Sequence, residues 1–387
     1  MKRVLAVLAI AALASSCATV KPKPPVVEVK FEPQVIKGDL ELEKLNDEEL
    51  FAQGSSAYAA NDWKQAARFF DRLADYYPQS PHLRAGLYNA GLAHERLEEW
   101  EDAHARFAEL ADAAKGQGDA LDATFRLAET EYHLGRFDDA AARLTTVAER
   151  LDLSWNKRIE AQVQKGVCQL EGGKSDVAEA SLRKAMAWFE TLTDKDEVDD
   201  YFPGQAQFFL GEIYRLHYES VVLDPDKGTE KLAQDLEYKA ELLLSAQGHY
   251  LRGIRLGNGY WATACGQRVG GMYENFYEHL INSPAPKELN AEEAEVYRQE
   301  LRKKIRVLLT KAINIYERTL EAAERIGARS TFVERTRDSL RKMKDLLVAD
   351  AQQDDPAPSA AAAPDPLPPP PAATPRGLKG RVTPRRN

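Results

Sequence analysis

The stretch NDWKQAARFF at residues 61–70 decides the fold, because it returns three times in altered form, as EEWEDAHARF at 98–107, GRFDDAAARL at 135–144 and GKSDVAEASL at 173–182. Each copy has an alanine at its sixth position and a large apolar residue four places later. The alanines lie 37, 37 and 38 residues apart and are Ala66, Ala103, Ala140 and Ala178. Twelve residues before each alanine stands a small residue; these are Gly54, Gly91, Ala128 and Gly166. A period and register held over four copies predict a solenoid of helix–turn–helix units, each burying its apolar face against the next.

These offsets resemble the tetratricopeptide repeat (TPR), a helix–turn–helix unit of about 34 residues with small and aromatic residues at fixed positions. The longer period of 37 residues implies slightly longer helices or loops. The resemblance implies an all-α fold, a right-handed TPR solenoid with four units in residues 46–188.

The second half of the chain keeps a helical pattern but loses the period. A fifth unit begins near Gln205, and its second helix is expected at about 236–255, beyond Asp224 and Pro225. Further helices are expected at 260–281, 290–326 and 331–347, the last of them highly charged and suited to cap the stack. Residues 189–349 are thus predicted to hold a fifth TPR-like unit, an irregular, degenerate helical module and a capping helix. Aromatic residues among glycines at 250–277 are expected to form core.

The first residues have the pattern of a targeting sequence. Lys2 and Arg3 precede an apolar run at 4–13, which is shorter than the roughly 20 residues of a membrane-spanning helix. Small residues and then Cys17 follow this run. The pattern predicts a signal peptide at residues 1–16.

The end of this segment resembles the lipobox of bacterial lipoproteins. Ala14 stands where leucine is the commoner residue, and Cys17 stands where that family carries its lipid. The resemblance implies lipid attachment at Cys17, with several acyl chains that together give stable anchoring. Ala18 is not aspartate, which implies the outer membrane, with the folded part facing the periplasm. An ordinary signal peptide cleaved nearby is the alternative.

Two segments flank the helical part and are rich in proline. Residues 17–45 are expected to be a lipidated tether. Ten of the 20 prolines lie in 356–384, so residues 350–387 are predicted to be a disordered Pro/Ala-rich tail. Its basic end consists of Arg376, Lys379, Arg381, Arg385 and Arg386. The net charge of −9, about −11 without residues 1–16, argues against nucleic acid as a partner.

Motifs for catalysis, metal or cofactor binding are incomplete. Gly172 to Ser175 resembles the end of a phosphate-binding loop but lacks the earlier glycine and a preceding strand. His94-Glu95 lacks the second histidine of a zinc protease, so His94 and His104 are expected at the surface. We therefore expect no enzyme, no cofactor and no small-molecule substrate. The sequence allows a disulfide between Cys168 and Cys265. A buried free thiol is favoured at Cys168, because this residue falls in a helical stretch.

The TPR resemblance also implies a binding surface, because the first helix of each unit lines a concave groove in that family. Counting the units in register gives the candidate partner-binding residues Phe51, Tyr58, Tyr88, Glu95, Phe125, Tyr132, Phe208 and Arg215. Aromatic side chains with polar tips are common in protein-recognition surfaces. The alternative for Phe51, Phe125 and Phe208 is packing between units, so the tyrosines are the better candidates for contact.

The predicted function is a protein-interaction scaffold or assembly factor for an envelope machine. By resemblance, the machines include outer-membrane protein assembly with BamD-type lipoproteins, pilus-secretin assembly, and the gliding-motility complex of myxobacteria. The alternative is a structural lipoprotein that touches the cell wall through its basic tail. A third interpretation, an enzyme with a divergent C-terminal module, has no motif to support it.

Overall fold

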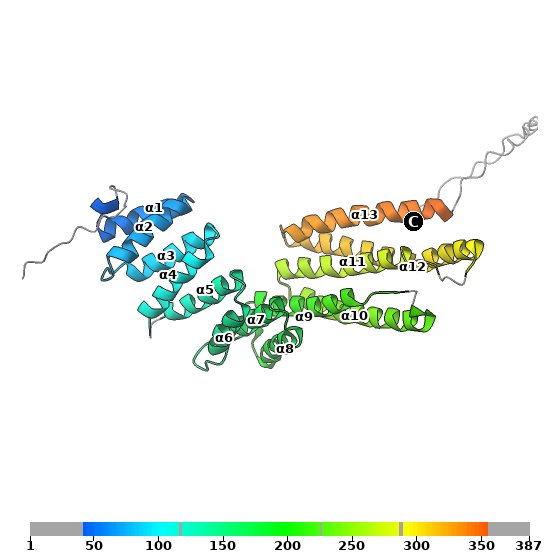
Figure 1. The fold of residues 1–387 in the computed structure, drawn as a ribbon, viewed down its shortest axis with the longest axis horizontal. Helices are drawn as coiled ribbons and strands as arrows, with labels where there is room; N and C mark the ends of the chain where they lie inside the picture. The colour runs from blue at the N-terminus through cyan, green and yellow to red at the C-terminus, as the bar shows by residue number, and fades with distance from the viewer. Residues whose placement is uncertain (1–41, 116–117, 225–226, 286–288, 355–387) are drawn as a thin grey trace, which may run out of the picture. The chain divides into compact units, whose positions relative to one another are not determined.

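The computed structural model describes residues 42–354 except 116–117, 225–226 and 286–288, and every regular element in this described part is helical (Figure 1). The chain divides into two units, 1–46 and 47–387. The described residues of the first unit include one 3₁₀ turn, Leu42–Lys44. None of the described helices combines the length and apolarity that a membrane span needs. Cys17, residues 17–41 of the predicted tether and residues 355–387 of the predicted tail lie outside the described residues.

Four helical hairpins open the second unit. Their helices are α1 (Asp47–Ala59) and α2 (Trp63–Tyr76), α3 (Leu83–Arg96) and α4 (Trp100–Ala113), α5 (Asp119–His133) and α6 (Phe137–Ala148), and α7 (Trp155–Glu171) and α8 (Ser175–Thr191). The second helix of each hairpin packs on the first helix of the next. The all-α solenoid expected from the sequence is therefore confirmed.

The turn inside each hairpin has a left-handed residue at one fixed position, two residues before the second helix begins. These residues and their φ angles are Asn61 (60°), Glu98 (61°), Gly135 (72°) and Gly173 (76°). A residue in this conformation ends a helix and satisfies its last carbonyl groups. Glycine and asparagine adopt it at low cost, so Glu98 carries the greatest backbone strain of the four. The glycines of the rejected phosphate-loop pattern thus terminate α7.

The interior of each hairpin is built on a close contact between a small residue and a large one. Gly54 lies against the ring of Phe70, and Gly166 lies against Leu182, so closely that a Cβ atom would collide. The register alanines that precede these large residues are fully buried; they are Ala66, Ala103, Ala140 and Ala178. Small side chains at both positions let the two helix backbones approach.

The same contact continues where the sequence period is lost. The later helices are α9 (Tyr201–Ser220), α10 (Thr229–Arg255), α11 (Gly259–Ile281), α12 (Ala291–Arg325) and α13 (Thr331–Asp354). Gly211 lies against Tyr250 and Gly270 against Tyr316, which joins α9 to α10 and α11 to α12. Four residues before each tyrosine stands a fully buried alanine, Ala246 or Ala312. The segment expected to be irregular therefore contains a fifth and a sixth hairpin with longer helices.

The last helix, α13, runs past the expected start of the tail at residue 350. Asp350 is buried on α13, and one of its carboxylate oxygens accepts a hydrogen bond of 2.5 Å from Nε of Arg306 on α12. Its other oxygen lies 3.6 Å from Nε of Arg302. This ion pair holds α13 in place beyond the predicted boundary, and the helix ends at Asp354.

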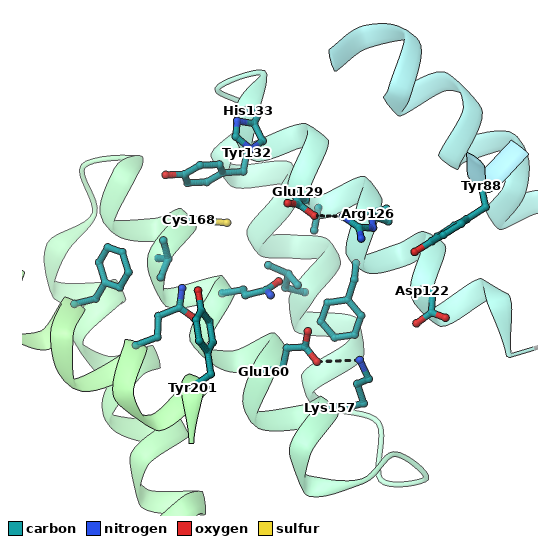
Figure 2. A pocket seen from close by; sticks show the side chains of 17 residues that line it. Tyr88, Asp122, Arg126, Glu129, Tyr132, His133, Lys157, Glu160, Cys168 and Tyr201 are labelled. Carbon is teal, nitrogen blue, oxygen red and sulfur yellow. Dashed lines mark hydrogen bonds and ion pairs between the residues drawn. The ribbon is translucent and has the colours of Figure 1, made fainter. Parts of the chain in front are cut away.

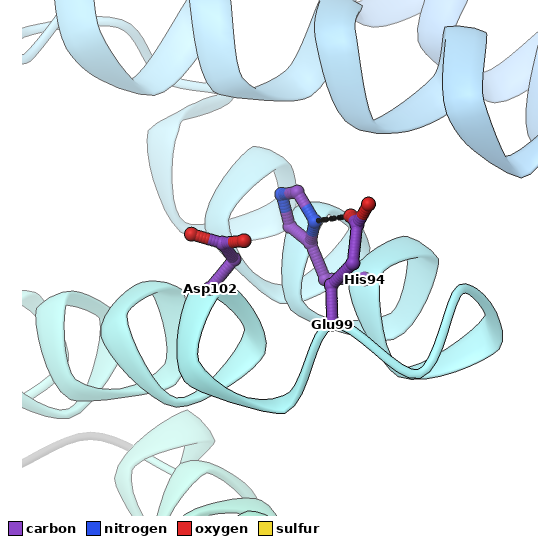
Figure 3. A group of neighbouring side chains, drawn as sticks. All are labelled: His94, Glu99 and Asp102. Carbon is purple, nitrogen blue, oxygen red and sulfur yellow. Dashed lines mark hydrogen bonds and ion pairs between the residues drawn. The ribbon is translucent and has the colours of Figure 1, made fainter.

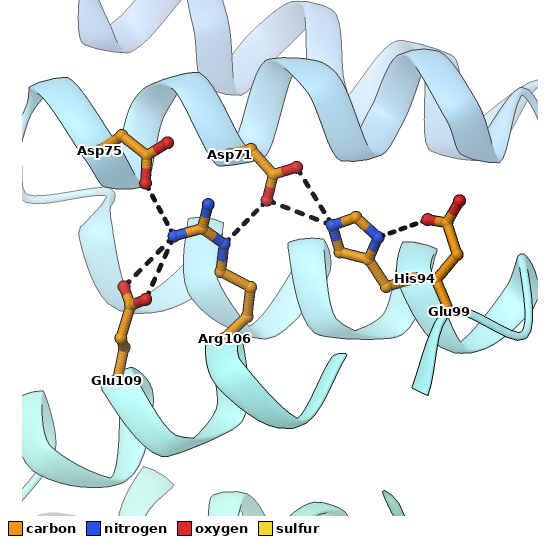
Figure 4. A network of polar contacts seen from close by, with 6 residues as sticks. All are labelled: Asp71, Asp75, His94, Glu99, Arg106 and Glu109. Atoms are coloured by element: carbon orange, nitrogen blue, oxygen red, sulfur yellow. Dashed lines mark hydrogen bonds and ion pairs between the residues drawn. The ribbon is translucent and has the colours of Figure 1, made fainter. Parts of the chain in front are cut away.

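Burial decides the state of the cysteines and the two histidines. Cys168 and Cys265 are both buried free thiols, as favoured for Cys168, and burial raises the pKa of Cys168 to about 12. The expected surface position of His94 is wrong: only 8 % of the residue is exposed, because it lies between two carboxylates (Figure 4). His104 is half-buried, with Nε2 3.4 Å from Glu131.

Candidate protein-binding groove

A cavity of about 480 Å³ opens along the first helices of four successive hairpins, α3, α5, α7 and α9 (Figure 2). We call it the groove. Its lining consists of Tyr88, Asp122, Phe125, Arg126, Ala128, Glu129, Tyr132, His133, Leu144, Lys157, Glu160, Gln164, Val167, Cys168, Tyr201, Gln205 and Phe209. All but Leu144, which comes from α6, stand on these four first helices.

Aromatic side chains of the groove are supported from behind by the second helices. The ring of Tyr88 meets Phe107 edge-on at 6.0 Å, and the ring of Tyr132 meets Phe137 at 5.5 Å. Both tyrosines are only partly buried. A supported aromatic ring offers contact area at little entropic cost, because few rotamers remain to be fixed on binding.

Three ion pairs place charge beside the aromatic rings of the groove. Arg126 of α5 reaches Glu129 at 2.9 Å and Glu95 of α3 at 3.3 Å. On α7, the Nζ atom of Lys157 lies 3.0 Å from Glu160. The same Nζ atom lies 5.0 Å from the ring centre of Phe125, within cation–π range. The groove therefore combines aromatic surface with charges of both signs.

Two buried acceptors at the groove lack a donor among the described residues. Oε1 of Glu95, beside Arg126, and Oε1 of Gln205, in the lining, accept no hydrogen bond. Burial raises the pKa of Glu95 to about 7, against the opposing effect of Arg126. An unpaired buried polar atom costs roughly 1–3 kcal/mol, so a ligand that donates hydrogen bonds here would recover part of that cost.

The groove brings together three of the residues selected from the sequence, Tyr88, Phe125 and Tyr132, with Glu95 joined to them through Arg126. Phe51 and Tyr58 lie elsewhere. Phe51 stacks on His82 at 4.7 Å, and Tyr58 packs edge-on against Trp63 at 4.8 Å.

The two remaining candidates belong to the longer hairpins. Phe208 is only 5 % exposed and packs on Tyr250 and Trp261, so it is core, in line with the alternative given for it. Arg215 is paired with Glu212 and lines a separate cavity of about 190 Å³ between α9 and α11.

Most of the lining was not selected from the sequence, including Arg126, Lys157, Tyr201 and Phe209. Arg126 and Phe209 directly follow the selected residues Phe125 and Phe208, so widening the register by one place would have found them. Tyr201 is the first residue of α9 and is 36 % exposed. It lies before the repeat register begins, and no sequence signal marked it.

Comparisons with known proteins agree with the repeat at the sequence level. The family model "Tetratricopeptide repeat" matches residues 50–80, which span most of α1 and all of α2. None of the curated proteins matches the chain.

Solved structures with similar helices share little sequence with the chain. The apo form of the quorum sensor NprR from B. thuringiensis is 14% identical, covers 80% of this chain and 90% of its own, and has a TM-score of 0.41. The Rap conjugation gene regulator of plasmid pLS20, in complex with the Phr* peptide, is 16% identical. It covers 87% of this chain and 84% of its own, with a TM-score of 0.33. A TPR repeats protein from Bacteroides fragilis is 14% identical. It covers 60% of this chain and 98% of its own, with a TM-score of 0.30. Residues 50–80 match a tetratricopeptide repeat by sequence, and the hairpins that follow repeat its helix–turn–helix packing.

Proposed function

We propose that the chain is a protein-interaction scaffold that holds a segment of a partner protein in the groove. The observation that carries this proposal is the joint lining by aromatic rings and paired charges of both signs. A peptide segment suits such a surface, because its side chains can pack on the rings and its polar groups can pair with the charges.

The extent of the groove favours a peptide over a small molecule. The groove crosses four successive first helices, from Tyr88 on α3 to Phe209 on α9. A ligand that touches both Tyr88 and Phe209 therefore has the length of a short peptide.

The site of action follows from the first residues of the sequence. We infer that Cys17 carries the lipid and that the folded part faces the periplasm from the outer membrane. A scaffold in that position would serve an envelope machine, of the gliding-motility or the outer-membrane and pilus assembly type. The alternative function is a structural lipoprotein that contacts the cell wall through its basic tail. The following experiment distinguishes the scaffold from this alternative.

The test compares what the full chain retains when it is purified from its own cells. A double variant, Tyr88→Ala with Tyr132→Ala, removes two supported rings from the groove. Truncating a central contact residue costs about 2 kcal/mol or more, so the pair should reduce retention of the partner at least about 100-fold. Tyr238→Ala is the matched control, because Tyr238 is an exposed tyrosine on α10, outside the groove.

The proposal predicts that one envelope protein is retained by the wild type and by Tyr238→Ala but lost from the double variant. Retention of that protein by all three chains would contradict the groove assignment. Capture of cell-wall fragments alone would support the rival function instead. Thermal melts of each chain distinguish loss of contact from loss of fold.

A further inference from the structure

A polar cluster that is separate from the groove surrounds His94, near the end of α3. The Nε2 atom of His94 lies 3.0 Å from Oδ2 of Asp71, on α2 of the preceding hairpin (Figure 4). The Nδ1 atom lies 2.7 Å from Oε2 of Glu99, the N-cap residue of α4. The imidazole ring is therefore fixed at both nitrogens.

Arg106 supplies the positive charge on only one side of this cluster. Its guanidinium reaches Asp71 at 2.9 Å, Asp75 at 2.8 Å and Glu109 at 3.2 Å. On the other side of the ring, neither Glu99 nor Asp102 forms an ion pair with a lysine or arginine within the described residues. Two carboxylates near the imidazole ring thus have no lysine or arginine partner within the described residues.

We propose that His94, Glu99 and Asp102 bind a divalent transition-metal ion, with zinc as the first ion to test. One potential ligand atom from each residue lies within 4.8 Å of the other two (Figure 3). A nitrogen and two carboxylate oxygens suit zinc, with water completing four-fold coordination, whereas magnesium and calcium prefer oxygen alone. His94 lies near the end of α3, Glu99 is the N-cap residue of α4 and Asp102 lies in the first turn of α4. Glu99 and Asp102 are exposed to solvent.

The surroundings of His94 have the form that metal-bound histidines need. If Nε2 carries its proton and donates to Asp71, the lone pair of Nδ1 points toward Glu99. Arg106 in turn fixes the carboxylate of Asp71. Burial favours the neutral ring, but the hydrogen bonds with Asp71 and Glu99 outweigh it and raise the pKa of His94. A proton at Nδ1 is therefore the competitor that the metal ion must displace.

His104, one helix further on, provides an internal contrast. Its Nε2 atom faces Glu131, but Arg143 already occupies that carboxylate through two nitrogens. No second carboxylate stands beside His104 in the described structure as a metal ligand would require. The zinc-protease pattern did not reveal the His94 site because the ligands come from two helices and the turn that joins them, at spacings of five and three residues, rather than from one helix face.

The test is a calorimetric titration of the metal-free full chain with zinc sulfate at pH 7.5. We expect one saturable equivalent of zinc, and Asp102→Asn should weaken its binding at least about tenfold. Glu101→Gln is the matched control, because Glu101 is the neighbouring acid of α4 and pairs with Arg136 instead. Its zinc affinity should equal that of the wild type.

A second variant, Asp71→Asn, probes the positioning of the ring. It keeps all three ligands but removes the carboxylate that orients His94, so affinity should fall by about tenfold with the same stoichiometry. X-ray absorption of the zinc-loaded chain should show nitrogen and oxygen ligands only. The proposal fails if the wild type binds no zinc saturably, or if Asp102→Asn and Glu101→Gln bind it equally well. Asp102 is exposed, so its replacement leaves the fold available for this comparison.

Discussion

Gly91 of α3 faces the ring of Phe107 of α4 so closely that a Cβ atom on residue 91 would lie 2.5 Å from two ring carbons. The equivalent contact in the fifth hairpin joins Gly211 to Tyr250 at the same distance. In the hairpins that carry glycine at this position, the close approach of the two helices thus depends on one missing methyl group; the third hairpin carries Ala128 there instead. The solenoid is built by repeating this contact.

Gly91→Ala should destabilise the chain, because the buried Phe107 ring has no free space into which it can move. Overpacking of this kind costs about 1–3 kcal/mol. Gly248→Ala is the control: Gly248 also lies inside a helix, but a Cβ there meets only the end of Arg252, at 3.8 Å. It should gain roughly 0.5–1 kcal/mol from helix propensity. Chemical denaturation of the two variants measures both values, and equal stabilities would show that the contact does not matter.

The end of the folded part can be located by truncation. Ending the chain after Asp354 should leave the melting temperature unchanged, whereas ending it after Ala349 should lower it. The shorter chain leaves Arg306 without the buried carboxylate of Asp350. Because the Arg306 side chain is 32% exposed, solvent replaces part of the interaction, and we expect a loss of about 1–2 kcal/mol. Asp350→Asn in the full chain should show a similar loss; a melting curve like that of the wild type would leave the ion pair without a role.

The stability of the C-terminal hairpins should depend on pH through His249. This residue is buried beside Gln207, and burial, with Arg252 and Arg183 nearby, lowers its pKa from 6.5 to about 4. Below pH 6.5, His249 binds a proton in the unfolded chain but stays neutral in the folded chain. The free energy of unfolding therefore falls as the pH decreases from 6.5 toward 4. The loss between pH 7.5 and pH 5 is about 2 kcal/mol from this group.

His249→Gln should remove that part of the pH dependence, whatever its effect on stability at pH 7.5. The measurement is the difference between the denaturation free energies at pH 7.5 and pH 5, for the variant and for the wild type. Identical differences for the two chains would mean that His249 is protonated in the folded state at pH 5.

The proposed anchor depends on a single sulfur atom. Cys17→Ser should leave the chain unprocessed or in the soluble periplasmic fraction, because no other cysteine stands near the expected cleavage site. Detergent-phase partitioning of cell extracts measures this. A serine variant that partitions as the wild type does would rule out lipid attachment at Cys17.

The first four hairpins could be predicted from the sequence because their period is nearly constant. For the last two, a unit from Gln205 and helices at about 236–255, 260–281 and 290–326 were expected, but the repeated contact was not recognised, although Ala246 with Tyr250 and Ala312 with Tyr316 keep the spacing of Ala66 with Phe70. Longer helices separate these pairs from their glycines, Gly211 and Gly270, so the period is lost while the contact survives. The repeat is conserved in its packing and variable in its length.

The groove could be predicted only where hairpins of equal length stack on one another. Register counting found Tyr88, Phe125 and Tyr132, which lie on such hairpins. It failed at Phe208, because α11 also packs on α9 and covers that position with Trp261. Ion pairs such as Arg126 with Glu95 join neighbouring repeats and have no local sequence pattern.

The most direct test of the central claim, that the groove holds a partner protein, is site-specific photo-crosslinking in intact cells. The crosslinking residue replaces Gln164, which lines the groove, or Leu244, which is 59% exposed on α10 and outside it. We predict that position 164 captures one defined envelope protein, that position 244 does not, and that adding Tyr88→Ala and Tyr132→Ala abolishes the capture. Capture of the same protein from both positions, or no capture from position 164, would contradict the account.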